Sequence, residues 1–206
     1  MTKAPKTPEP REKPYPSREI TDPRAMRALA HPRRLDLLET LFADGPLTAS
    51  QCAERLGGSP ASCSYHLRQL ATWGFVEETG EGRGRERPWR YVPIGNSFGG
   101  GSTENQRAAA QLLSGIVNER RFAKAREFQA TIERQPEEWV AVSHSDDYAF
   151  WATPEETDEL GQQIMELLGT YQRRTFDGDR PEGSRLVQWL LYAFPLPTRG
   201  TKADDA

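Results

Sequence analysis

The feature that most limits how this chain can fold is the stretch LGGSP beginning at Leu56, which separates two short helical patterns. Two consecutive glycines end the first pattern, because glycine readily adopts the left-handed conformation that closes a helix. Ser59 and Pro60 are typical of the N-cap and first turn of the next helix. Thr48 is a matching N-cap for the first of the two helices. The sequence therefore predicts two short helices joined by a tight turn, the second running to about Gly74.

Further elements flank this pair. Upstream, apolar residues recur at helical spacing, and Pro32 is expected to break that run near His31. Downstream, FVEET and PWRYVP alternate like two strands around the glycine- and arginine-rich GEGRGRER, which reads as a hairpin with a long tip. The predicted order is helix, helix, helix, hairpin.

Composition divides the chain into regions. The first twenty residues hold five prolines and almost nothing apolar, so residues 1–20 are expected to be a disordered tail. Glycine and serine concentrate again near residue 100, which indicates a linker over 96–103. We therefore expect domains at 21–95 and 104–196, with a second disordered tail at 197–206.

The second half gives a different pattern. A long helical run follows Thr103 and ends by Pro136; it is polar on one side and reads as a connector or dimerisation helix. Alternating residues around HSDD predict a hairpin, and SRLVQWLLYAFPLP predicts a final strand. Between them, Thr153 and Glu156 form a capping box that begins a helix. The side chains that this helix should bury are Leu160, Ile164, Leu167, Leu168 and Tyr171. The fold class is α+β: the three-helix and hairpin domain, then a long helix and a small α+β domain of β-hairpin, helix and strand.

A family resemblance rests on several motifs in the right order. The runs ALAHPRRLDLLETL and LTASQCAERLGGSPASCSYHLRQLATWGFVEE, followed by a basic hairpin ending in RYVP, resemble the winged helix-turn-helix domain of the ArsR-type bacterial transcriptional regulators over about residues 22–93. The resemblance implies that the helix beginning at Pro60 is a recognition helix. It also implies a wing in the hairpin.

The recognition helix has two faces. At about 100° per residue, Cys63, Leu67 and Leu70 form one stripe, which we expect to be buried. The opposite face carries small, hydroxyl-bearing and donor-rich side chains that suit base edges and phosphates in a major groove; a solvated face is the competing interpretation. The predicted DNA-contacting residues of this helix are Ser59, Ser62, Ser64, Tyr65, His66, Arg68 and Gln69.

Cys63 and His66 lie three positions apart, a spacing that could hold a metal ion. Cys63 is expected to point inward, His66 lies on the flank of the buried stripe, and no third ligand is near. The family's metal-sensing members carry a Cys-x-Cys pair where this chain has Thr48 and Ser50. We therefore predict no metal site and no cofactor.

Arginines concentrate in the wing, where glycines allow a close approach to a phosphate backbone. Arg83, Arg85 and Arg87 are predicted to contact DNA. The competing interpretation is a solubilising loop, because nearby glutamates cancel much of the charge.

Aromatic residues are frequent in the second half. They could form the core and dimer contact of a small domain, or line a pocket for an apolar or aromatic effector. The candidate effector-binding residues are Trp139, Phe150, Trp151, Tyr171, Trp189 and Tyr192.

Charge and cysteine content restrict the function classes. Residues 1–99 hold 15 Lys and Arg against 12 Asp and Glu, although the whole chain carries a net charge of −3, so the first half is the basic one. Two cysteines make no disulfide framework, and no N-terminal apolar run resembles a secretion signal or a membrane span. We expect a reduced, cytoplasmic, bacterial protein without membrane contact.

The predicted function is a sequence-specific transcriptional regulator that binds double-stranded DNA as a homodimer on a near-palindromic operator. A small-molecule effector is a further predicted partner. The alternative is a winged-helix module for protein–protein interaction without DNA binding. We predict no enzyme activity and no catalytic residue, because no nucleophile–base pair, glycine-rich phosphate loop or carboxylate pair can be defended.

Overall fold

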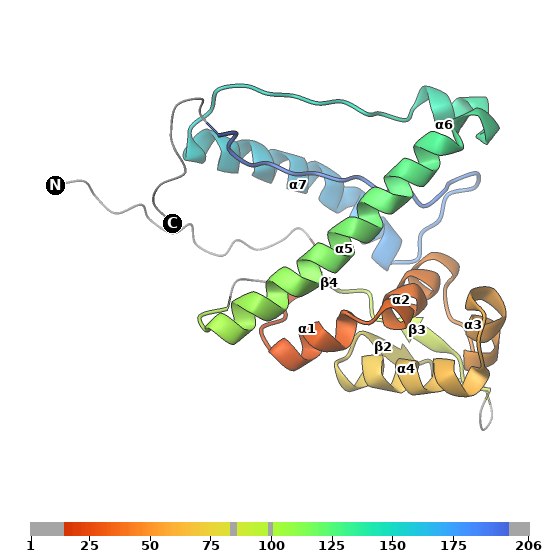
Figure 1. The fold of residues 1–206 in the computed structure, drawn as a ribbon. Coiled ribbons are helices and arrows are strands. Elements are labelled where there is room, and N and C mark those ends of the chain that lie inside the picture. Colours follow the sequence, from red (N-terminus) through yellow and green to blue (C-terminus); the bar gives the residue numbers. More distant parts are fainter. Residues whose placement is uncertain (1–14, 83–85, 99–100, 198–206) are drawn as a thin grey trace.

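Helices make up most of the structure, and its strands are short (Figure 1). The computed structural model describes residues 15–82, 86–98 and 101–197. In chain order the elements are β1 (Ser17–Glu19), α1 (Pro23–Leu29), α2 (Pro32–Asp44), α3 (Ala49–Leu56), α4 (Pro60–Thr72), β2 (Val76–Glu78), β3 (Trp89–Tyr91), β4 (Gly95–Ser97), α5 (Glu104–Ala130), the 3-10 turn η1 (Ile132–Arg134), α6 (Glu137–Ala141) and α7 (Pro154–Phe176). The predicted α+β class, with an N-terminal winged helix-turn-helix and a long helix after it, is confirmed.

Local capping sets the corner between α1 and α2. The carboxylate of Asp22 accepts a hydrogen bond from the backbone N–H of Arg24 at 2.8 Å, which caps α1. α2 begins at Pro32, and Nδ1 of His31 accepts a hydrogen bond from the backbone N–H of Arg33 at 3.2 Å. Proline fits this first turn because its missing N–H would have no helical partner there. The predicted break at Pro32 is confirmed.

The turn between α3 and α4 also has the predicted form. Thr48 closes a reciprocal capping box at the start of α3. Gly57 and Gly58 follow the helix with φ angles of +72° and +93°, in the region that favours glycine. Ser59 then caps α4, its hydroxyl accepting a hydrogen bond from the backbone N–H of Ser62 at 3.2 Å.

The wing is the antiparallel pair β2 and β3, in which Glu77 lies opposite Arg90. Leu47, between α2 and α3, extends it by exchanging two backbone hydrogen bonds of 2.8 and 2.9 Å with Trp89. The indole of Trp89 is buried, so this residue packs on the helices as expected. The predicted hairpin is confirmed.

A parallel pair of strands replaces part of the expected tail and linker. Ser17 to Glu19 form β1, which pairs with β4 at Gly95 to Ser97. The sequence assigned β1 to the tail at 1–20, and the last two residues of β4 to the linker at 96–103. Arg18 explains the difference: its guanidinium donates to the Gly74 carbonyl at 2.9 Å and to Oδ1 of Asn96 at 2.8 Å. These contacts offset the entropy of ordering the segment.

One hydrophobic core joins α1 to α4, the wing and the start of α5. Its most completely buried large side chains are Met26, Leu37, Leu41, Leu67, Leu70, Phe75, Val76 and Leu113. Leu113 belongs to α5, so the first turns of that helix pack inside the N-terminal domain rather than in the separate unit expected at 104–196.

Two predicted features of the C-terminal half are wrong. Residues 137–141 form helix α6, the residues from 143 to 153 form neither helix nor strand, and neither do residues 184–197. The expected hairpin and final strand are therefore missing from the described chain. A strand needs a partner for its ladder of hydrogen bonds, and neither segment has one here.

The capping box that begins α7 at Thr153 and Glu156 is confirmed. The burial predicted for the apolar side chains along this helix is not confirmed. Leu160, Leu167 and Tyr171 are exposed, since little of the described chain packs over their stripe. No helix of the described part is long and apolar enough to cross a membrane.

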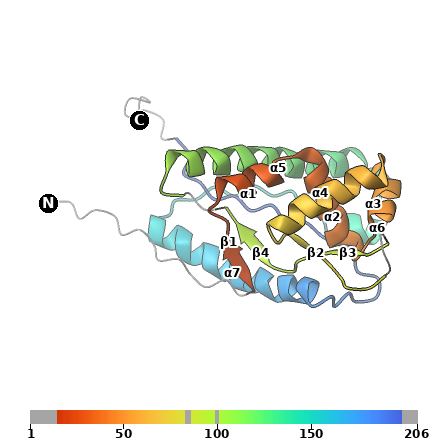
Figure 2. The same ribbon diagram turned by 90° about the horizontal axis from the view of Figure 1, so that it is seen from below.

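The elements lie in three layers around α5. Figure 1 shows α5 running diagonally through the molecule, with α4 and the wing on one side and α7 on the other. Figure 2 looks at the side of α4, which lies in front of the other helices. The recognition helix and the C-terminal half therefore lie on opposite sides of α5.

Candidate nucleic-acid interface

Helix α4 divides into the two predicted faces. Cys63, Leu67 and Leu70 are buried, with exposed fractions of 1% or less, and pack on the core. The buried stripe is confirmed. It fixes the rotation of α4 about its axis, so the opposite face must point outward.

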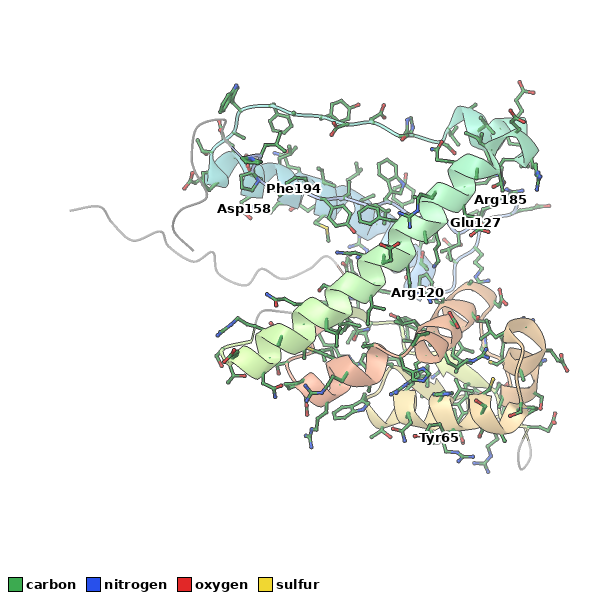
Figure 3. All side chains as sticks on the ribbon, viewed as in Figure 1. Tyr65, Arg120, Glu127, Asp158, Arg185 and Phe194 are labelled. Carbon is green, nitrogen blue, oxygen red and sulfur yellow. The ribbon has the colours of Figure 1, made fainter. Side chains whose placement is uncertain are left out.

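The outward face carries polar side chains that no other element covers. Ser59, Ser62, Tyr65 and Arg68 are exposed, whereas Ser64 and Gln69 are half-buried. Figure 3 shows Tyr65 on the outer side of α4, pointing away from the protein, and its exposed fraction is 57%. Such a row of exposed donors on a short helix has the dimensions of a major-groove reading surface.

Arg68 is held by a neighbour one turn earlier. Its Nη2 donates a hydrogen bond to Oγ of Ser64 at 2.7 Å. This contact limits the rotamers of Arg68 and keeps its guanidinium on the outward face. Since α4 contains no acidic residue, nothing on the helix neutralises that charge.

His66 faces the N-terminus of α2. Its ring lies against that of His31, with centroids 4.6 Å apart, and its Nδ1 is buried without a hydrogen-bond partner among the described residues. Burial lowers the pKa of His66, and the charges of His31, Arg34 and Arg33 lower it further. The neutral imidazole is therefore favoured in the folded chain, at the contact between α2 and α4.

The sequence did not identify Arg33 and Arg18 as positioning residues. Nη1 of Arg33 donates to the carbonyl of Leu56 at 2.9 Å, which satisfies a free carbonyl at the end of α3. Arg18 joins β1 to Gly74, and its guanidinium lies 5.0 Å from the ring centroid of Phe75. Both contacts join residues far apart in sequence, so no local pattern could indicate them.

The described part of the wing pairs its charges internally. Arg87 forms an ion pair with Glu78 at 3.3 Å, and Arg90 forms one with Glu77 at 2.7 Å. Arg83 and Arg85 lie outside the described residues. The wing therefore carries less free positive charge along its strands than its arginines suggest.

The two thiols lie in the core. Burial is the main cause that raises the pKa of Cys52 to about 11, and it also raises the pKa of Cys63. Both thiols are therefore protonated at neutral pH and behave as small apolar groups. No group of three or more His, Cys, Asp or Glu side chains that could hold a metal occurs in the described ranges.

The predicted effector residues are mostly exposed. Phe150, Trp151, Tyr171, Trp189 and Tyr192 are exposed, and Trp151 has an exposed fraction of 96%. Two of the six, Trp139 and Tyr192, contact different parts of the chain.

Trp139 is half-buried, and the guanidinium of Arg185 lies 5.3 Å from the centroid of the Trp139 ring. Tyr192 stacks on Phe122 of α5, with ring centroids 5.5 Å apart.

A hollow occurs elsewhere, between α2, the start of β4 and the end of α7. It is an open cleft of about 270 Å³. Its lining is Tyr15, Leu38, Glu39, Phe42, Tyr91, Gly95, Gln172 and Phe176. None of the six predicted effector residues lines it.

Comparison with known proteins identifies the domain that holds α4. Residues 29–79 match a family described as a helix-turn-helix domain. This span covers α2 to β2, so the helix-turn-helix part of the prediction is confirmed. The match names no regulator family, and the ArsR-type resemblance stays a prediction.

Likeness over the whole chain is weak. No curated protein matches it. A solved structure of a MarR family regulator from Neisseria meningitidis shares 16% sequence identity, covers 73% of this chain and 81% of its own, and has a TM-score of 0.30. A likeness at that level carries no conclusion about this protein.

Proposed function

We propose that the protein is a sequence-specific, DNA-binding transcriptional regulator that acts as a homodimer. The observation that carries the proposal is the outward face of α4, in a domain that matches the helix-turn-helix family. Its inward face is fixed in the core, while Ser62, Tyr65 and Arg68 are exposed and uncovered. A helix held in this way can enter a major groove without rearrangement.

The chemistry of the outward face favours direct reading of bases. Arg68, which Ser64 holds in place, can donate two hydrogen bonds to O6 and N7 of guanine. Tyr65 can contact a phosphate or the methyl group of thymine. Ser59 and Ser62 lie at the start of α4, where backbone N–H groups favour a phosphate.

The wing supports α4 through phosphate contacts. Gly80 and Gly82 have φ angles of +79° and +85°, which turn the chain just before Arg83. Arg87 would have to leave Glu78 to reach DNA, and their 3.3 Å ion pair is exposed and weak. We therefore assign Arg83 and Arg85 the larger share of the wing contact.

The homodimer and the effector belong to the same proposal. Exposed apolar side chains concentrate in the C-terminal half, on the far side of α5 from α4, which supports pairing there. The cleft at Phe42 and Phe176 is a better place for a small apolar ligand than the six predicted aromatics, because its aromatic side chains line one shared hollow. A ligand in that cleft would contact both α2 and α7.

Binding to selected DNA tests the proposal. The full-length chain should retain specific fragments of the native genome, with an affinity that falls steeply as salt rises. Arg68→Ala should weaken binding to those fragments by about 10- to 100-fold but weaken binding to random DNA little, since a bidentate arginine–guanine pair is worth about 1–3 kcal/mol.

The matched control is Arg134→Ala, an exposed arginine of η1 remote from α4. It should bind like the parent. If Arg68→Ala binds the selected fragments as tightly as the parent, the surface that recognises bases is not the outward face of α4 at Arg68. A parent chain that retains no duplex fragment even at low salt would refute the proposed function.

One observation favours the alternative, a winged-helix module for protein contacts. The ion pairs of Arg87 with Glu78 and of Arg90 with Glu77 neutralise the described strands of the wing. In that case duplex DNA would not be retained, whatever its sequence. The same binding experiment therefore separates the two functions.

A further inference from the structure

Two extended segments of the C-terminal half leave their backbone without partners. They are the first extended segment, residues 144–152, and the second extended segment, residues 185–197, and Figure 1 shows both as drawn-out stretches that run along α7. Within these residues the structure contains no strand ladder and no backbone–backbone hydrogen bond. Their N–H and C=O groups are therefore available to another strand.

The second extended segment has the composition of a strand that is buried on both faces. It reads RLVQWLLYAFPLP, and it contains no charged residue after Arg185. In an extended chain successive side chains point to opposite faces, so Trp189 and Leu191 lie on one face and Tyr192 and Phe194 on the other. Apolar residues on both faces are typical of a strand inside a covered sheet, not of a solvent-exposed loop.

These side chains are nevertheless largely exposed in the single chain. Leu186, Val187, Trp189, Leu191, Tyr192, Phe194 and Leu196 have exposed fractions between 46% and 69%. Taking about 150–250 Å² for each aromatic side chain, Trp189, Tyr192 and Phe194 alone expose on the order of 300–400 Å², and the four aliphatic side chains add to this. The largest apolar patch of a typical monomer is about 300–600 Å², whereas a stable interface takes about 800 Å² from each partner.

Contacts inside the chain fix the place of the second extended segment but do not cover it. The hydroxyl of Tyr192 donates to Oδ1 of Asn118 on α5 at 3.0 Å, and its ring stacks on Phe122. The ring of Trp189 lies 6.4 Å from that of His144 in the first extended segment. The segment is therefore held against α5 while its hydrogen-bonding edge stays open.

We infer that a second copy of this chain covers the second extended segment by pairing its own second extended segment in an antiparallel ladder. A two-fold contact brings the same surface of both copies together, and an antiparallel pair of identical strands satisfies that symmetry. The neutral composition allows the pairing, because no like charges meet along residues 186–197. This inference deepens the homodimer of the proposed function and rests on it.

The position of the segment suits a DNA-binding dimer. Figure 1 places it on the side of α5 opposite α4, and Leu167 and Tyr171 expose an apolar stripe on α7. That stripe can cover one face of the new sheet. Pairing there leaves α4 of both copies uncovered, so dimer formation and groove reading do not compete.

The experiment uses the full-length chain. Light scattering should give twice the chain mass of 23.2 kDa. Hydrogen exchange should show protection at alternate amides between residues 186 and 194 in the dimer, because only every second N–H of a two-stranded ladder points to the partner. Successive N–H groups of a strand point to opposite edges, so one of the two variants Leu190→Pro and Leu191→Pro removes an N–H from the ladder. That variant should raise the dimer dissociation constant by on the order of 100-fold, while proline remains compatible with an extended chain.

Arg180→Pro is the matched control, because residue 180 lies before the segment and its N–H donates to no backbone carbonyl of the described chain. It should dimerise like the parent. Circular dichroism checks that all variants keep their helices. If the proline variants at 190 and 191 fail to fold, the exchange pattern of the parent chain decides alone.

Three results would overturn the inference: a monomeric parent, a dimer whose amides at 186–194 exchange freely, or protection of those amides in a monomer. The last would mean pairing within one chain. Failure of the DNA-binding function is a separate outcome. A dimer with a protected second extended segment that binds no DNA would refute the regulator but support the pairing.

Discussion

Gly58 shows how one residue controls the angle at which α4 leaves α3. Its φ angle is +93°, and a Cβ added there would lie 3.2 Å from Nη2 of Arg33, the side chain that closes the last turn of α3. Gly58→Ala should therefore lower the free energy of unfolding by about 1–2 kcal/mol, through backbone strain and displacement of Arg33. Urea denaturation measures the change.

Gly115→Ala is the control for this substitution. Gly115 lies inside α5, and an added Cβ would meet nothing within 4 Å. Alanine is the better helix former by about 1 kcal/mol, so this variant should be more stable than the parent. If both alanines change stability in the same direction, the account of the turn at Gly58 is wrong.

His66 gives the protein a pH-dependent stability. Its pKa is lowered, first by burial and then by the charges of His31, Arg34 and Arg33. The unfolded chain therefore binds more protons than the folded chain below about pH 6.5, so stability falls as pH drops from that value toward the folded pKa. Above about pH 6.5 both states are neutral and His66 has no effect.

The test compares the parent with His66→Gln. Between about pH 7.5 and 5.5 the parent should lose more of its free energy of unfolding than the variant, because only the parent has this histidine to protonate. Carboxylates titrate alike in both chains and cancel in the difference. An identical pH profile for the two proteins would exclude His66 as the source.

At the scale of elements, α5 is joined to the helix-turn-helix domain by an ion-pair cluster. Nη2 of Arg120 contacts Oδ1 of Asp36 at 2.6 Å and Oε2 of Glu39 at 3.0 Å, and Nζ of Lys124 contacts Glu39 at 2.9 Å. Figure 3 labels Arg120 where α5 passes α2. The guanidinium is 27% exposed, so it is the least screened member of the cluster.

Arg120→Ala should lower the free energy of unfolding by about 1–3 kcal/mol, because Asp36 and Glu39 lose a partner at a half-buried site. Lys124→Ala, which removes a more exposed partner of Glu39, should cost less than about 0.5 kcal/mol. Thermal or urea unfolding measures both. Equal losses for the two variants would mean that Arg120 does not hold the contact between α5 and α2.

The elements also differ in how far the sequence predicts them. Helices α3 and α4 were predictable because Thr48, the glycines and Ser59 are local caps, and the phase of α4 placed Tyr65 and Arg68 on its outer face. Strand β1 was not, because it pairs with β4, 78 residues away. Arg33 was missed for the same reason, since its partner carbonyl lies on another helix.

The prediction of strands in the C-terminal half was wrong for a different reason. The apolar run over residues 186–196 is real, but a strand exists only with a partner, and the described chain offers none. Periodicity reports which faces are apolar and cannot report what covers them. A second copy would supply the missing partner.

At the scale of the whole molecule, the proposed dimer would decide which operators can be read. Each copy has one α4, and the proposed pairing surface lies on the other side of α5. Two α4 helices related by a two-fold axis must enter successive major grooves on one face of the duplex. The half-sites should therefore be inverted repeats whose centres lie about 10–10.5 base pairs, or a multiple, apart.

Changing that spacing tests the dimer geometry. Inserting about five base pairs between the half-sites turns them to opposite faces of the duplex, and binding should fall to the affinity of a single half-site. Inserting about ten base pairs restores the face but not the distance, so recovery should be partial at most. Gel retardation of the three duplexes measures the series. Equal affinity for all three would mean that the two α4 helices are not rigidly joined, and that the C-terminal half only tethers them.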